Sequence, residues 1–124
     1  CAVCHRRASD LEPEKIRPDN PDIARFQPVG LVQSACFRDS PKMTCTTCHD
    51  PHKPMSAQDS AGIWQCLQCH LEESTRDGDG HASGCAAGYV DGCLQCHMPK
   101  VPLNRSVSFT DHWIRVRSSD EENP

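Results

Sequence analysis

The residues of this chain best suited to chemistry are its cysteines and histidines, which recur in one pattern. Eight of the ten cysteines lie in four copies of Cys-x-x-Cys-His, the attachment site of haem c. Two thiols add to the vinyl groups on one edge of the porphyrin, and the following histidine coordinates the iron. The thioether cysteines are therefore Cys1, Cys4, Cys45, Cys48, Cys66, Cys69, Cys93 and Cys96. The proximal iron ligands are His5, His49, His70 and His97. The sequence predicts four haem c groups.

Three other chemistries use closely spaced cysteines. Cys45, Cys48, Cys66 and Cys69 have the spacing of a zinc site, but zinc does not require a histidine directly after each second cysteine. A thioredoxin-like redox site has one Cys-x-x-Cys in a βαβ setting, and the chain shows no strand-rich pattern. An iron–sulfur cluster would need a third nearby cysteine. The repeated histidine therefore favours haem.

Three histidines lie outside the motifs and are candidates for the distal iron ligands: His52, His81 and His112. His52 follows His49 by three residues, too few for the chain to pass around the porphyrin edge, so it would serve a neighbouring haem. Four irons with two histidines each would need eight, and the chain has seven. The fourth iron could take a methionine, keep an open position, or accept a histidine from another subunit or a preceding segment. Because the chain begins inside its first motif, we expect a donated histidine.

Cys36 and Cys85 belong to no motif. Haem c is attached outside the cytoplasm, where disulfides persist, so a Cys36–Cys85 disulfide is expected. Two buried thiols are the alternative. The same reasoning places the protein in the periplasm or outside the cell.

The composition explains why such a chain needs its cofactors. Leu, Ile, Val and Phe make up only about 16 % of the 124 residues, below the roughly 20 % typical of chains that fold on their own core. We expect the haems to supply the missing apolar mass, with Trp64, Phe109 and Trp113 packed against them. No stretch is apolar enough to span a membrane. A net charge of −4 without a basic stripe argues against a nucleic-acid partner.

The elements that must position these residues are short. The expected fold is mostly loop with short α-helices and little or no β-sheet, wrapped around four haems. Residues 1–117 would form the tetrahaem module, either alone or as the C-terminal part of a longer multihaem chain, and 118–124 an acidic tail. The expected helical segments are Asp22 to Phe26, Gly30 to Phe37, a turn from Ser40-Pro41 into the second motif, Ala61 to Cys69, and Gly92 to His97.

Several segments resemble multihaem cytochromes c with doubled haem motifs, a group often fused to tetratricopeptide repeats. These segments are Ser34-Ala35-Cys36-Phe37, Cys45 to Lys53 with its Asp50-Pro51-His52, Gly92 to Lys100, and Thr110 to Arg115. The group is similar to pentahaem nitrite reductase, to octahaem hydroxylamine oxidoreductase and to the tetrahaem electron acceptor of the latter. The resemblance implies that His52 and His112 are distal ligands, and it is compatible with a Cys36–Cys85 pair.

Two functions follow as expectations. The first is electron transfer through closely packed haems, to redox partner proteins or between copies of the chain in an extracellular filament, in which one axial histidine could cross the subunit boundary. The second is an oxidoreductase that acts on a small nitrogen or sulfur oxyanion at one open haem. All four motifs keep histidine, whereas nitrite reductases place lysine in one motif, so the first function is favoured and no catalytic residue is assigned. Arg25, Arg38, Lys53 and Arg105 are candidate partners of haem propionates.

Overall fold

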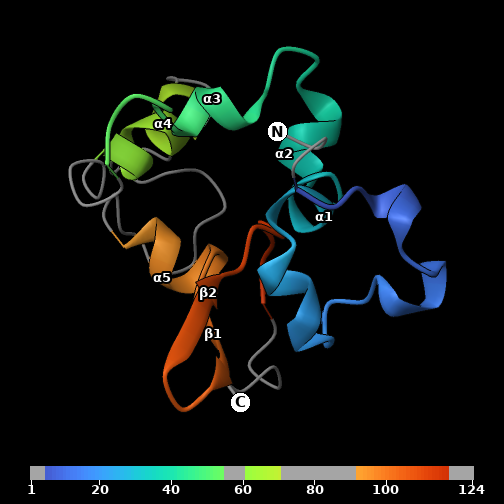
Figure 1. The fold of residues 1–124 in the computed structure, drawn as a ribbon. Helices are drawn as coiled ribbons and strands as arrows, with labels where there is room; N and C mark the ends of the chain where they lie inside the picture. The colour runs from blue at the N-terminus through green and yellow to red at the C-terminus, as the bar shows by residue number, and fades with distance from the viewer. Residues whose placement is uncertain (1–4, 55–60, 71–91, 118–124) are drawn as a thin grey trace. The chain divides into compact units, whose positions relative to one another are not determined.

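A computed structural model describes residues 5–54, 61–70 and 92–117 (Figure 1). These residues form short helices joined by loops, with one small antiparallel sheet, so the expected fold class of loops and short α-helices with little sheet is confirmed. The chain divides into two compact units, residues 1–43 with 95–124 and residues 44–94. Among the described residues, no helix has the length and apolar character needed to cross a membrane.

The first unit begins with three 3₁₀ helices: η1 (Ala8–Asp10), η2 (Pro13–Lys15) and η3 (Pro21–Arg25). Asn20 begins η3, because its side-chain oxygen accepts a hydrogen bond from the Asp22 backbone N–H at 3.1 Å and Pro21 supplies the fixed φ of the first helical residue. The helix predicted from Asp22 to Phe26 is therefore present within one residue at each end, as a 3₁₀ rather than an α-helix.

The predicted helix from Gly30 to Phe37 is two helices in the structure. These are α1 (Gln27–Leu31) and α2 (Ala35–Asp39), separated at Ser34, whose backbone is extended at φ −69° and ψ 136°. The Ser34 side chain is buried and bonds to residues near the C-terminus: its hydroxyl donates to the His112 carbonyl at 3.2 Å and accepts from the Ile114 N–H at 2.8 Å. These distant contacts take Ser34 out of the helix, which the local pattern could not show.

A hairpin follows the fourth motif. Strand β1 (Lys100–Asn104) pairs antiparallel with β2 (Val107–Thr110), with Lys100 opposite Thr110 and Val101 opposite Phe109 (Figure 1). Asn104 closes the turn, because its side-chain oxygen accepts from the backbone N–H groups of Ser106 at 2.9 Å and Val107 at 3.0 Å. The sequence did not indicate these strands, since most of their side chains are exposed and show no alternation.

The aliphatic core of the described residues is small. It consists of Ile23, Ala24, Val29 and Val101, which are at most 9 % exposed. Helix η3 supplies two of them and contacts α1, β1 and β2, so it is the centre of the first unit. In the part of the chain that the structure describes, aliphatic packing therefore orders only the neighbourhood of η3.

The second unit contains α3 (Cys45–Cys48) and α4 (Ala61–His70), which contact each other. Thr44 caps α3 through reciprocal hydrogen bonds with Thr47, in which the Thr44 N–H donates to the Thr47 hydroxyl at 2.9 Å. Helix α4 begins at the predicted residue and ends one residue later than predicted. Ser60 directly precedes this helix in the sequence, as a capping serine would, and lies outside the described residues.

Candidate haem-attachment site

Each of the three motifs that the structure describes lies on a helical turn. In a helix, residues three and four apart share one face, with Cβ atoms roughly 5–6 Å apart. A Cys-x-x-Cys-His sequence in helical conformation therefore presents two thiols and an imidazole on one side. Cys1 and Cys4 of the first motif lie outside the described residues, and its histidine, His5, is exposed.

The second motif occupies α3, and its histidine follows the helix. Cys45 and Cys48 are the first and last residues of α3, and both are half-buried. His49 has an extended backbone at φ −117° and ψ 130°, although its N–H still donates to the Cys45 carbonyl at 3.0 Å. The imidazole of this motif therefore leaves the chain at the point where the helix ends.

The third motif forms the last turn of α4. Cys69 and His70 are exposed and Cys66 is half-buried. Trp64, two residues before Cys66, is 66 % exposed. Residues two apart on a helix do not share a face, so Trp64 lies on the side of α4 opposite to the two thiols and the imidazole. Cys66, Cys69 and His70 share one face of α4, as attachment to a single haem requires.

The fourth motif is α5 (Cys93–His97) in its entirety. The helix is entered through Gly92, whose φ of 79° lies in the left-handed region that a side chain disfavours. The His97 ring nitrogen Nδ1 lies 2.9 Å from the carbonyl oxygen of Arg115. A carbonyl can only accept, so Nδ1 carries the proton and donates it. In the neutral ring this leaves Nε2 as the nitrogen that can bind a metal.

Of the three candidate distal ligands, His112 has the same arrangement as His97. Its Nδ1 donates to the Thr110 carbonyl at 2.9 Å, so Nε2 is again the nitrogen that could bind a metal. Both carbonyls belong to residues 110–117, which we call the C-terminal strap. One segment of chain thus fixes the tautomer of two candidate iron ligands, an arrangement usual for metal-binding histidines.

His52 lies in a tight turn after the second motif. Its N–H donates to the Asp50 carboxylate at 3.0 Å, and the Lys53 ammonium lies 3.3 Å from the same side chain. The hydrogen bond from His52, and after it the Lys53 ammonium, lower the pKa of Asp50. His52 is exposed. Its assignment as a distal ligand of a neighbouring haem stays a prediction. His81 lies outside the described residues.

Asp111 holds the C-terminal strap in place. Its carboxylate is 5 % exposed and accepts the Trp113 N–H at 2.8 Å and the Arg115 guanidinium at 2.9 Å. Arg117 donates to the same carboxylate, and Arg115 also reaches the Pro18 carbonyl at 3.1 Å. Asp111 and Ser34 were not singled out from the sequence. The signal for Asp111 was an acidic residue beside a candidate ligand, with arginines four and six residues later.

The zinc alternative requires a metal site that is built from side chains alone. Among the residues that the structure describes, no three His, Cys, Asp or Glu side chains gather as they would around a metal ion. The zinc alternative would require Cys45, Cys48, Cys66 and Cys69 to converge. A haem iron takes four ligands from its porphyrin and needs only two from the protein, so the haem interpretation requires no such cluster.

The predicted disulfide involves Cys85, which lies outside the described residues, so it stays a prediction.

Comparison of the chain with protein-family models, with curated proteins and with solved structures found no match. The candidate site therefore stands on its residues and their geometry.

Proposed function

We propose that this protein transfers electrons through four covalently attached haem c groups. The observation that carries the proposal is the agreement of motif and geometry at α5. There the whole Cys93–His97 motif is one helical turn, and the Nδ1 of its histidine is bonded to a backbone carbonyl so that Nε2 is left for coordination. The third motif also lies on a helical turn, and in the second motif the two cysteines lie on one and His49 directly follows it.

The number of histidines available as axial iron ligands favours electron transfer over catalysis. Seven histidines supply both axial ligands of three irons and one of the fourth. An iron with two histidine ligands has no position for a substrate. With one haem per about 31 residues, the porphyrins must lie close to one another, which suits electron tunnelling between them.

The haem, when bound, supplies a one-electron couple, and the residues of the chain do the rest. Eight cysteines would fix the porphyrins in place. The carbonyls of Thr110 and Arg115 hold protons at Nδ1 of His112 and His97, which raises the basicity of Nε2 and lowers the reduction potential of the iron that it binds.

The proposal extends to location and partners. Covalent haem attachment places the protein in the periplasm or at the cell exterior, and its partners would be other redox proteins or further copies of itself. The odd number of histidines supports a ligand donated across a subunit boundary or from another part of a longer chain.

Intact mass and low-temperature EPR of the native protein test the proposal together. We expect the mass of the polypeptide plus four haems, and low-spin signals from the oxidised irons. A mass without haem would end the proposal. Four haems with a strong high-spin signal would instead favour the oxyanion-reducing or oxyanion-oxidising enzyme.

A further inference from the structure

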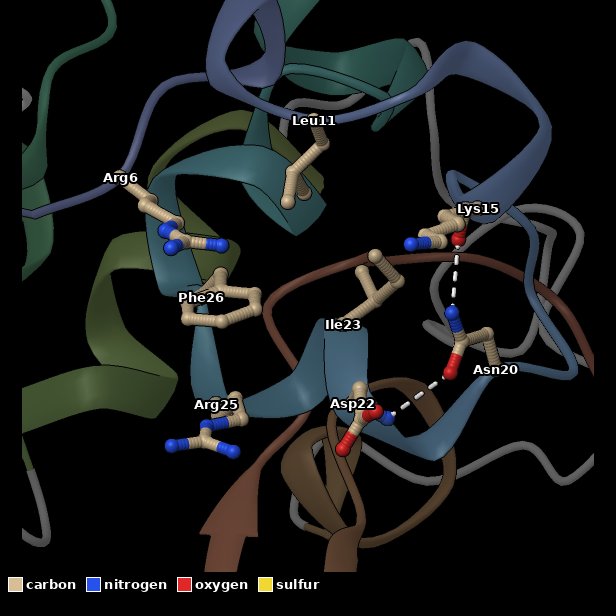
Figure 2. Close-up of a pocket in the computed structure, with 8 residues that line it drawn as sticks. All are labelled: Arg6, Leu11, Lys15, Asn20, Asp22, Ile23, Arg25 and Phe26. Atoms are coloured by element: carbon tan, nitrogen blue, oxygen red, sulfur yellow. Dashed lines mark hydrogen bonds between the residues drawn. The ribbon is translucent and has the colours of Figure 1, made fainter.

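The first unit contains an open pocket of about 260 Å³ beside η3, whose lining is mainly basic and apolar (Figure 2). Its apolar lining is Leu11, Ile23 and Phe26. Its charged side chains are Arg6, Lys15, Arg25 and Asp22. Three cations face one carboxylate, so the pocket has a positive potential that attracts an anion.

Two of the cations share one aromatic ring. The Arg6 guanidinium lies 5.1 Å and the Arg25 guanidinium 5.3 Å from the centre of the Phe26 ring, with Arg6 above the ring and Arg25 below it in the view of Figure 2. Stacking on the ring positions both guanidiniums while leaving their N–H groups available for hydrogen bonds. The ring lies between the two guanidiniums, so each of them can bind a carboxylate of its own.

The ion pairs around the pocket distinguish Arg6 and Arg25 from Lys15. Lys15 is neutralised by Glu12 at 2.7 Å. Within the described residues, no carboxylate lies within ion-pair distance of Arg6 or Arg25. Lys53, another candidate from the sequence, already contacts Asp50. The positive charge available to an external anion is therefore that of Arg6 and Arg25.

The chemistry of the pocket describes its occupant. A guanidinium suits a carboxylate, which it can bind through two parallel hydrogen bonds. The apolar residues Leu11, Ile23 and Phe26 suit an uncharged body attached to that carboxylate. A porphyrin edge with its propionates has both parts. Arg6 directly follows His5 of the first motif, so the haem attached at that motif is the nearest source.

Resting on the proposed function, we infer that Arg6 and Arg25, held on Phe26, bind the propionates of the haem attached at Cys1, Cys4 and His5. Two positive charges there stabilise the reduced state of that haem and keep the pKa of its propionates low. The reduction potential of this haem would therefore be higher with the two arginines than without them.

The test uses the full chain with its haems and the variant Arg25→Gln. The matched control is Arg17→Gln, which removes one positive charge from the same N-terminal segment but from an exposed pair with Asp19 at 3.2 Å. In a spectroelectrochemical titration of Arg25→Gln, we expect one haem component to move to lower potential. The pH range over which the potential of that component changes should move to higher pH, because the propionate pKa rises when the guanidinium is lost. The control should leave both unchanged.

Three outcomes would overturn the inference. One is a mass with four haems and no shift beyond that of the control, which leaves the proposed function standing. The second is a mass without haem, which removes both. The third is a component that added phosphate shifts in the native protein but not in Arg25→Gln, since the pocket would then bind an anion from solution.

Discussion

At the scale of single residues, Asp111 has the largest structural role in the described part of the chain relative to its size. Its buried carboxylate receives one backbone N–H and two guanidinium groups, all from the C-terminal strap. The strap in turn provides the carbonyls that bond His97 and His112. A carboxylate that is not itself a candidate ligand can therefore determine how both histidines are presented.

Replacing Asp111 by asparagine tests this role. The amide introduced at this position could still accept the Trp113 N–H, but the charge that holds Arg115 and Arg117 would be lost from a site that is almost fully buried. We expect Asp111→Asn to lower the free energy of unfolding of the haem-loaded protein by about 2 to 3 kcal/mol, measured in urea. EPR of the same variant should show altered low-spin signals, since the imidazole orientations change with the strap.

The matched control is Asp19→Asn, because Asp19 pairs with Arg17 on the surface, where its side chain is 74 % exposed. That change should lower the free energy of unfolding by less than about 1 kcal/mol and leave the EPR signals unaltered. Equal effects of the two variants would show that the buried network does not position the strap.

At the scale of elements, the sequence predicted the helices whose signals lie within or directly beside their own residues. The Ala61–His70 helix was predicted to within one residue, because its sequence is uninterrupted by proline and carries Ile63 and Leu67 on one face. The position of η3 followed from Asn20-Pro21. The hairpin was missed, because Lys100–Asn104 and Val107–Thr110 are short and mostly exposed.

The parts of the candidate site that could not be predicted are contacts between distant segments. The cysteines and the histidine of each motif lie within five consecutive residues, so the motif could be recognised from the sequence alone. The hydrogen bond from His97 to Arg115 joins residues 18 apart, and it depends on the hairpin between them. The Ser34 contacts with His112 and Ile114 join residues 78 and 80 apart. No pattern in the sequence encodes such pairs.

Helix α1 and the C-terminal strap provide a test at this scale. Gly30 is buried, and a Cβ atom on it would lie 2.8 Å from the Trp113 nitrogen and 3.1 Å from the His112 carbonyl carbon, both backbone atoms. Gly30→Ala should therefore push the strap away from α1 and destabilise the protein by about 1 to 3 kcal/mol, measured by urea unfolding. Because His112 is displaced with the strap, the potential of one haem should shift as well.

Ala35→Ser is the control for Gly30→Ala. It also adds one heavy atom near the same helices, but Ala35 is exposed, so nothing has to move. Its stability and its haem potentials should match those of the native protein. A Gly30→Ala protein that matches it in both would mean that α1 and the strap do not pack as closely as their backbones indicate.

At the scale of the whole molecule, haem binding would explain both the small apolar core and the excess of cysteine. Four side chains form the buried apolar set of the described residues, and two of those are Ala24 and Val29. Burial of so few apolar groups releases far less free energy than the conformational entropy that ordering the chain consumes. Four porphyrins would supply the missing apolar surface, and eight thioethers would fix them to the polypeptide.

The chain without haem should therefore be unfolded. We expect the polypeptide made where haem is not attached, with serine at the eight motif cysteines as a second version, to show a disordered far-UV circular dichroism spectrum and no cooperative thermal transition. The haem-loaded protein should show helical signal and a sigmoidal melt, because its covalently attached porphyrins are buried against the chain only in the folded state. The serine version controls for disulfides formed wrongly between unoccupied motifs. A compact haem-free chain that melts cooperatively would mean that the helices of Figure 1 pack without porphyrin, and that the haems are attached to a fold held by other contacts.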